Sequence, residues 1–160
     1  MFPGGRESNV LHIALWQPEI PPNTGNIARS CAATGTRLHL IGRLGFHLDD
    51  RNLRRAGCDF WSAVDVHYHA TVEDFLAELK GTRLLPFTAR ASTPYTTVTY
   101  QQGDCLLFGS ESEGLPERLL HPHDQIPLCI PMPAGKVRSL NLATAAGIVL
   151  YEALRQLQAW

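Results

Sequence analysis

Short, mainly apolar runs that do not alternate with polar residues, separated by helical patterns, are the feature of this sequence that most restricts its fold. Residues 11–16, 83–88 and 105–109 are such runs, and apolar residues occupy most neighbouring positions in each. A strand that is apolar on both sides is buried on both sides, and alternation of strands with helices gives parallel pairing. We therefore predict an α/β fold with a mostly parallel sheet and helices on both faces.

The expected elements follow from these runs and from the residues that interrupt them. The expected strands are residues 11–16, 37–41, 63–68, 83–88, 105–109 and 126–130, and helices are expected up to residue 34 and over residues 50–56, 71–80, 116–120 and 139–157. Asn23 or Thr24 is expected to cap the first helix, and Thr71 with Asp74 to cap the third. A polar, threonine-rich crossing is expected between residues 88 and 105.

The composition fits one packed domain, because 44% of the residues are hydrophobic and 18% are charged. We expect a flexible leader over residues 1–10 and a single domain over residues 11–160. A net charge of -1 argues against a strongly cationic nucleic-acid binder. Residues 26–60 nevertheless hold six arginines against three aspartates. Because the guanidinium fork suits phosphates and carboxylates, this segment is a candidate contact for such groups.

Several features favour a cytoplasmic protein. The four cysteines form no CxxC pair and are interpreted as buried thiols of a reducing compartment. The first residues lack the apolar run of a signal peptide. The longest apolar stretch, residues 140–151, is shorter than the roughly 20 residues that span a bilayer. We expect no membrane contact.

Three loops that follow predicted strands concentrate glycine, proline, amide and hydroxyl residues: residues 17–26, 109–116 and 131–141. Ligands of parallel sheets bind at the carboxyl ends of strands, so chemistry is expected at these loops. In the first, Asn23 and Asn26 flank a helix start and Arg29 shares a face with Asn26, which suits a phosphate. The alternative is a simple helix cap and a surface ion pair.

The second loop leaves further alternatives open. Glu111 and Glu113 lie between two glycines, which allow close approach of the backbone to a ligand. Ser112 lies in a near match to the GxSxG elbow of hydrolases, although a serine replaces the first glycine. No metal site is expected, because the pair His67 and His69 lacks a third ligand, as do His121 and His123.

The last helix, residues 139–157, is apolar nearly all round and rich in small residues. Such a helix is expected to be buried on both sides. A domain of this size has few elements with which to cover it, so we predict a homodimer packed partly through this helix. The alternative is a central core helix in a monomer.

Residues 18–29, residues 108–116, and residues 130–132 with 138–142 together resemble, in order and spacing, the three motifs of the SPOUT methyltransferases. The resemblance covers residues 11–157. It is greatest to the small tRNA 2′-O-methyltransferases that modify the wobble cytidine or uridine of leucine tRNAs. Residues 45–46 and 53–57 also match that subfamily.

The resemblance implies a deep trefoil knot at the C-terminal end of the sheet and a homodimer. It also implies that S-adenosylmethionine binds in the knot, largely through backbone groups, at Phe87, Gly109, Ile130 and Ser139. The implied reaction is methyl transfer to a ribose 2′-hydroxyl of the tRNA anticodon stem-loop, without a metal ion.

Five polar residues match the motif positions, and the resemblance implies that they are catalytic: Arg29, Asn23, Glu111, Ser139 and Asn141. In the resembled family, an arginine at the place of Arg29 is proposed to take the hydroxyl proton with help from a substrate phosphate. Because a guanidinium is almost always charged, we expect Arg29 instead to clamp the phosphate and stabilise the developing alkoxide. The expected RNA contacts are Arg29, Arg51, Arg54, Arg55 and Arg138.

The sequence departs from the usual pattern at Phe87, where a smaller aliphatic residue is commoner, and at Ala143 and Thr144, where relatives often have Ser-Asn.

Two other functions remain open. One is a 2′-O-methyltransferase that acts on ribosomal RNA or another tRNA position. The other is a non-catalytic RNA-binding or assembly protein, which would not need the five polar residues together.

Overall fold

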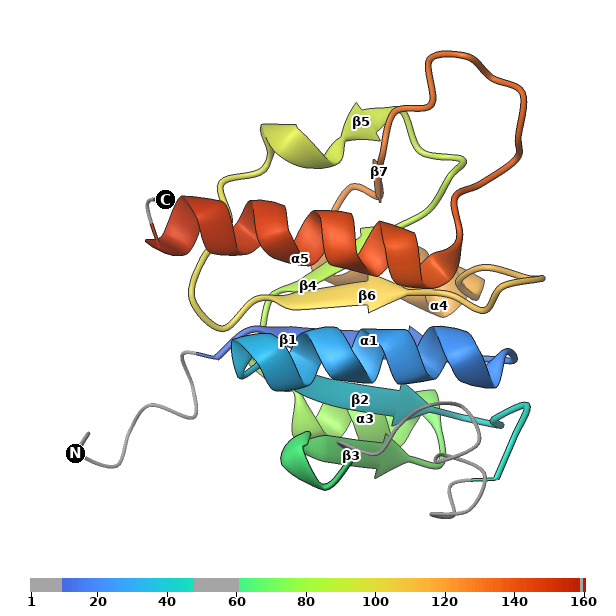
Figure 1. Ribbon diagram of the computed structural model, residues 1–160, viewed down its shortest axis with the longest axis vertical. Helices are drawn as coiled ribbons and strands as arrows, with labels where there is room; N and C mark the ends of the chain where they lie inside the picture. The colour runs from blue at the N-terminus through green and yellow to red at the C-terminus, as the bar shows by residue number, and fades with distance from the viewer. Residues whose placement is uncertain (1–9, 48–60, 159) are drawn as a thin grey trace.

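A parallel sheet forms the centre of the molecule, and the computed structural model describes residues 10–47, 61–158 and 160. Within these residues, seven strands lie in the order β3-β2-β1-β6-β4-β7-β5, and each pairing is parallel. The strands are β1 (His12–Trp16), β2 (Arg37–Ile41), β3 (Val66–His69), β4 (Leu84–Phe87), β5 (Thr93–Pro94), β6 (Cys105–Phe108) and β7 (Leu128–Cys129). Figure 1 shows that the N-terminal strands lie on one side of β6 and the later strands on the other.

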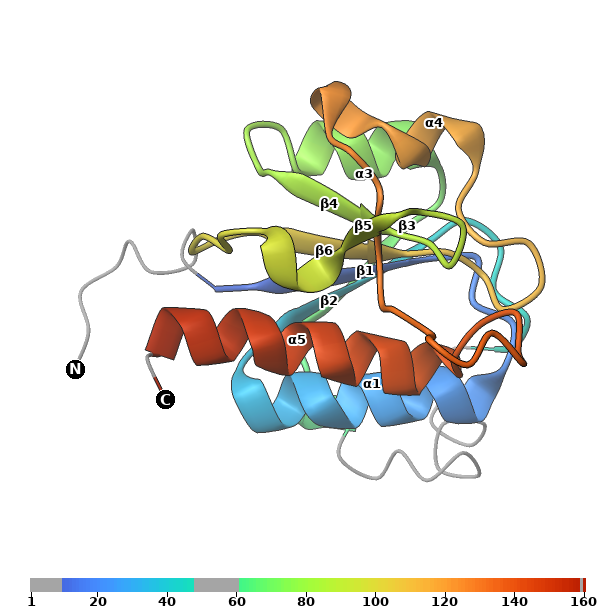
Figure 2. The ribbon, with the colours of Figure 1, turned by 90° about the horizontal axis from the view of Figure 1, so that it is seen from above.

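Helices cover both faces of the sheet, which confirms the predicted architecture (Figure 2). On one face, α1 (Pro21–Thr34) and α5 (Leu142–Gln158) lie side by side, and on the other lie α3 (Val72–Glu78) and α4 (Glu117–Leu120). Three short 3-10 turns complete the described elements: Trp61–Ala63 (η2), Tyr95–Thr97 (η3) and Pro122–Asp124 (η4). No helix in the described part of the chain is long and apolar enough to cross a membrane.

Neighbouring residues of one strand enter two different cores, which explains why the apolar runs do not alternate with polar residues. Ile13 and Leu15 of β1 pack in the core on the side of α1 and α5, whereas Ala14 packs in the core that holds Phe75 of α3. All four side chains are fully buried. Burial of one large aliphatic or aromatic side chain contributes about 1.5–3 kcal/mol, so both layers of helices are needed to stabilise the sheet.

The first helix begins earlier than predicted. Ile20 is its N-cap and Pro21 its first residue, so the prediction that Asn23 or Thr24 caps it was wrong. Proline suits this position because its fixed φ matches the helix and its missing N–H would have no partner in the first turn. The end of the helix was predicted correctly, with Gly35 at a φ of 71°.

Two strand boundaries also differ from the prediction. The third strand begins at Val66 rather than at residue 63, because residues 61–63 form a 3-10 turn. β7 is shorter than residues 126–130, since only Leu128 and Cys129 reach partners in β4 and β5. The polar, threonine-rich crossing contains β5, a two-residue strand that its composition did not indicate.

The helix predictions had mixed success. Thr71 caps α3 as predicted, because its hydroxyl accepts a hydrogen bond from the Asp74 amide at 3.1 Å. α5 begins at Leu142 instead of residue 139. The helix predicted over residues 50–56 lies outside the described residues, as does most of the predicted leader.

Candidate functional site

A cavity of about 960 Å³ opens at the carboxyl ends of the central strands. The loops that follow β1, β4, β6 and β7 form its walls together with the start of α5. All three loops that the sequence singled out contribute to it. The predicted site residues that line the cavity are Asn23, Phe87, Gly109, Glu111, Ile130, Arg138, Ser139 and Asn141.

Glu111 connects the loop after β6 to the loop after β1. Its Oε1 accepts a hydrogen bond from the Glu19 amide at 2.9 Å. Its Oε2 accepts hydrogen bonds from the Ile20 amide at 2.8 Å and from Asn23 Nδ2 at 3.1 Å. The two amides lie at the start of α1, where the helix dipole favours a negative charge. Because three donors already bind its carboxylate, Glu111 anchors the two loops to one another.

Glu19 makes the reverse connection. Its Oε1 accepts hydrogen bonds from the hydroxyl of Ser112 at 2.5 Å and from the Ser112 amide at 3.0 Å. These bonds hold the pKa of Glu19 below its usual value, and the bond from the hydroxyl has the larger effect. The Ser112 hydroxyl therefore donates to a carboxylate in a loop–loop contact, which does not fit the role of a hydrolase nucleophile.

Asn23 links this pair of loops to the third. Its Oδ1 accepts a hydrogen bond from Asn141 Nδ2 at 2.9 Å. Asn141 in turn caps α5, because its Oδ1 accepts a hydrogen bond from the Thr144 amide at 3.1 Å. Glu111, Asn23 and Asn141 thus form one chain of hydrogen bonds across three loops that are distant in the sequence. Ser139 is exposed on the same wall of the cavity.

The loop after β6 is closed tightly on itself. The amides and carbonyls of Ser110 and Gly114 bind each other at 3.3 and 3.0 Å. A Cβ atom on Gly109 would lie 2.0 Å from the carbonyl carbon of Gly114, so only glycine fits at position 109. Beside it, the rings of Phe87 and Phe108 stack with centroids 5.1 Å apart. The cavity therefore has a compact backbone loop next to an aromatic wall.

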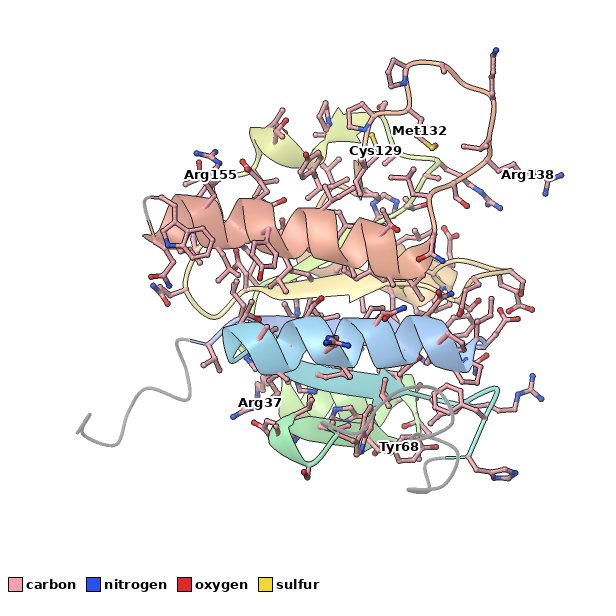
Figure 3. The ribbon with its side chains drawn as sticks, in the orientation of Figure 1. Arg37, Tyr68, Cys129, Met132, Arg138 and Arg155 are labelled. Carbon is pink, nitrogen blue, oxygen red and sulfur yellow. The ribbon has the colours of Figure 1, made fainter. Side chains whose placement is uncertain are left out.

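The predicted RNA-binding arginines do not all lie in the cavity. Arg138 is an exposed part of its wall, on the long segment before α5 (Figure 3). Arg29 is exposed on α1, on the same side as Asn26, but it is not one of the residues that line the cavity. Arg51, Arg54 and Arg55 lie outside the described residues.

Sequence reasoning missed two residues at this edge. Glu19 was included only as part of a proline-rich loop, although a carboxylate beside a helix start could have been singled out for its hydrogen-bonding capacity. Arg90, which follows β4, lines the cavity and is exposed. No sequence pattern marked it, because it lies in a segment that was interpreted as a simple crossing.

The family of the chain follows from its sequence as a whole. The model of the SpoU rRNA Methylase family matches residues 10–151. The chain belongs to this family. This SpoU methylase is 52% identical over 151 residues to a putative tRNA (cytidine(34)-2′-O)-methyltransferase of Synechocystis, and the match covers 93% of this chain and 98% of that protein. It is 45% identical to the tRNA (cytidine(34)-2′-O)-methyltransferase of Escherichia coli K12, with 92% and 94% covered.

Solved structures agree with this assignment. The SpoU methylase matches a structure described as "Structural insights into the 2-OH methylation of C/U34 on tRNA" with a TM-score of 0.88 and 49% identity, over 96% of this chain and 99% of that chain. It also matches the SpoU methyltransferase AviRb from Streptomyces viridochromogenes in complex with AdoMet. That match has a TM-score of 0.81 and 25% identity, over 96% of this chain and 62% of the other.

Proposed function

We propose that this SpoU methylase transfers a methyl group from S-adenosylmethionine to the 2′-hydroxyl of the wobble nucleotide of tRNA, a cytidine or uridine, in leucine tRNAs. The observation that carries the proposal is the hydrogen-bonded chain of Glu111, Asn23 and Asn141, which joins the three motif loops around one cavity. Relatives that are 45–52% identical are named for this reaction at cytidine 34.

The cavity fits S-adenosylmethionine in size and in chemistry. Ligand sites for small molecules commonly measure about 300–1,000 Å³, and this cavity lies within that range at about 960 Å³. Phe87 and Ile130 offer an apolar wall for the adenine ring. The compact loop at Gly109 presents backbone groups, and Ser139 adds a hydroxyl. The cofactor residues predicted from the sequence would therefore hold the methyl donor.

The bound donor supplies an electrophilic methyl group on a positively charged sulfur. In the transfer, the ribose oxygen forms a bond to the methyl carbon, the carbon–sulfur bond breaks with its electron pair left on sulfur, and the hydroxyl proton leaves to a substrate phosphate or to water. Ser139 and Asn141, exposed on the cavity wall, orient the ribose. Glu111 and Asn23 act as positioning residues, because their hydrogen bonds hold Asn141.

Arginines hold the RNA backbone. Arg138 on the cavity wall and Arg29 on α1 clamp phosphates of the anticodon stem-loop and stabilise the developing negative charge on oxygen. We assign Arg51, Arg54 and Arg55 to further phosphate contacts. Because these contacts are ionic, tRNA affinity should fall steeply with added salt.

We also infer that the chain is knotted and acts as a cytoplasmic homodimer without a resident metal in this cavity. The order β4-β7-β5 supports a knot, since the last strand enters between two earlier strands. Exposed apolar residues support a dimer: Ile20 is 45% exposed and Tyr151 of α5 is 47% exposed. Arg29 does not line the cavity of its own subunit. In a dimer it could instead reach the cavity of the second subunit.

The test is methyl transfer from tritiated S-adenosylmethionine to purified leucine tRNAs, bulk tRNA and ribosomal RNA, with mapping of the modified nucleoside. We expect 2′-O-methylation at the wobble position. Arg29→Ala should abolish transfer while donor binding survives. Arg155→Ala is the matched control, because Arg155 pairs with Glu152 at the end of α5 away from the cavity (Figure 3).

The other outcomes discriminate between the alternatives. Methylation of ribosomal RNA or of another tRNA position would overturn the proposed substrate. RNA binding without any methyl incorporation would favour a non-catalytic binding protein. Mixing Arg29→Ala with Asn141→Ala tests the dimer, because activity returns only if the two residues act from different subunits.

A further inference from the structure

Three histidines from three neighbouring strands lie against one another on the sheet face that α3 covers. They are His12 of β1, His39 of β2 and His69 of β3, with exposed fractions of 5%, 1% and 5%. Phe75 of α3 meets the rings of His39 and His69 edge-on, with centroids 5.8 and 5.4 Å away. None of these residues lines the cavity described above.

The imidazole nitrogens form a continuous row that ends at a carboxylate. His12 Nδ1 lies 2.8 Å from His39 Nε2, and His39 Nδ1 lies 2.9 Å from His69 Nε2. His69 Nε2 also lies 3.2 Å from Oε2 of Glu78, at the end of α3. Ligand atoms of His39, His69 and Glu78 all lie within 4.8 Å of one another.

Counting protons shows that this row has too few of them. Buried imidazoles are neutral at neutral pH, and each neutral ring carries one N–H. If His69 Nε2 carries its proton, that single proton faces both Glu78 Oε2 and His39 Nδ1. His39 then carries its proton on Nε2 and donates it to His12 Nδ1. His39 Nδ1, His69 Nε2 and Glu78 Oε2 are three atoms that can each bind a proton or a metal ion, and they therefore meet at one place and share a single proton.

We propose that His39 Nδ1, His69 Nε2 and Glu78 Oε2 bind a divalent transition-metal ion of the Zn²⁺ class. Two imidazoles and one carboxylate are a preferred donor set for such ions. Tetrahedral bonds of 2.0–2.1 Å place neighbouring ligand atoms about 3.3 Å apart. The observed separations of 2.9 and 3.2 Å need only a small opening. Because the Glu78 side chain is 46% exposed, water can complete the coordination.

The surroundings orient the ligands as metal sites require. An ion bound at His39 Nδ1 requires the proton of His39 to be on Nε2, and His12 Nδ1, 2.8 Å away, is placed to accept it. His67 Nδ1 lies 3.3 Å from Oε1 of Glu78, and its Nε2 lies 2.9 Å from Oδ1 of Asp65. The second oxygen of Glu78 is thus engaged, so the carboxylate binds the ion through one oxygen.

The ion would connect the end of α3 to β3, the strand at the edge of the sheet. Edge strands have a neighbour on one side only and are held less firmly. We expected no metal site from the sequence, because the pair His67 and His69 lacks a third ligand. Of that pair only His69 is a ligand here. His39 comes beside it through the parallel pairing of β2 with β3, and Glu78 lies at the end of α3.

The test uses full-length protein dialysed against a chelator and then titrated with ZnCl₂. We expect a dissociation constant in the micromolar range or below. At a free Zn²⁺ concentration one hundred times this constant, Tm should rise by about 5–10 °C. Co²⁺ should bind at the same place with visible absorption typical of a four-coordinate site.

Glu78→Gln keeps the size of an exposed side chain and removes the anionic ligand, so it should weaken Zn²⁺ binding at least tenfold and abolish the rise in Tm. His69→Gln should do the same. The matched control is His123→Asn, which removes an exposed imidazole on η4, near β4, and asparagine tolerates the φ of 49° at that position. It should bind as the parent does.

Two results would overturn the proposal. One is an absence of any Tm rise or Co²⁺ absorption in the parent protein, which would mean that the row of histidines is only a hydrogen-bond network. The other is binding that persists undiminished in both Glu78→Gln and His69→Gln, which would place the ion elsewhere. Because the readouts are binding and unfolding, neither result depends on methyl transfer.

Discussion

The substitution Glu111→Gln isolates the contact that joins two loops of the cavity. Glutamine can keep an oxygen where Oε2 accepts hydrogen bonds from the Ile20 amide and from Asn23. Its NH₂ group then faces the amide of Glu19, so two donors oppose each other in place of a hydrogen bond to a charge. The fold and the volume of the side chain are otherwise retained.

The magnitude follows from that one lost contact. A hydrogen bond to a charged group contributes about 1.5–3 kcal/mol, and solvent exposure of this pair reduces the figure to about 1–2 kcal/mol. In a chain of this size, 1 kcal/mol shifts Tm by about 2–4 °C, so a decrease of about 2–8 °C is expected. Methyl transfer should fall about tenfold to a hundredfold, because without this contact the loop after β6 is held less firmly against the loop of Asn23, which positions Asn141.

The assay combines thermal unfolding with tritiated methyl transfer on the same preparations. Glu113→Gln is the matched control, because it removes the same charge two residues away, and the Glu113 carboxylate has no hydrogen-bond partner among the described residues. If both variants have the same Tm and the same rate, the carboxylate at position 111 does not connect the two loops.

Other regions of the molecule give three further predictions. Asp104 is buried and binds Arg83 at 2.6 Å, so Asp104→Asn should lower the free energy of unfolding by about 2–4 kcal/mol in a urea titration. Burial raises the pKa of the Cys31 thiol to about 12, so this thiol remains protonated at pH 8. Iodoacetamide should therefore label the half-buried Cys129 well before Cys31, as measured by peptide mass analysis. Gly109→Ala places a methyl group against the backbone of the loop after β6, so donor affinity in a calorimetric titration should fall at least tenfold, and unchanged affinity would exclude a donor site there.

Local patterns in the sequence were sufficient to predict the layers of the fold. Apolar runs such as residues 105–109 identified strands, and Gly35 identified a helix end, because these signals act over a few residues. The same logic found the motif loops, since all of them follow strands. The contacts between the loops were not predictable, because Glu111 and Asn23 meet only after strands distant in sequence have paired.

The errors have a common physical cause. Tertiary contacts determine whether a two-residue segment such as β5 or β7 is a strand, and no local pattern encodes them. The row of histidines was missed for the same reason, because His12, His39 and His69 come together only through the order of the strands. The first helix start was missed because Asn23 and Thr24 are good capping residues, whereas Pro21 and Pro22 before them already form the first turn.

The strand order also governs when the molecule can become stable during synthesis. β1 pairs on one side with β2, which follows it closely, and on the other with β6. The second pairing cannot form until Cys105, the partner of His12, has been synthesised. β7 follows later still and must enter between β4 and β5. Parallel pairing between distant segments is slow and leaves apolar strand edges open. The nascent chain therefore carries an unpaired apolar edge for most of translation, and its cooperative stability arises only when nearly all of it has left the ribosome.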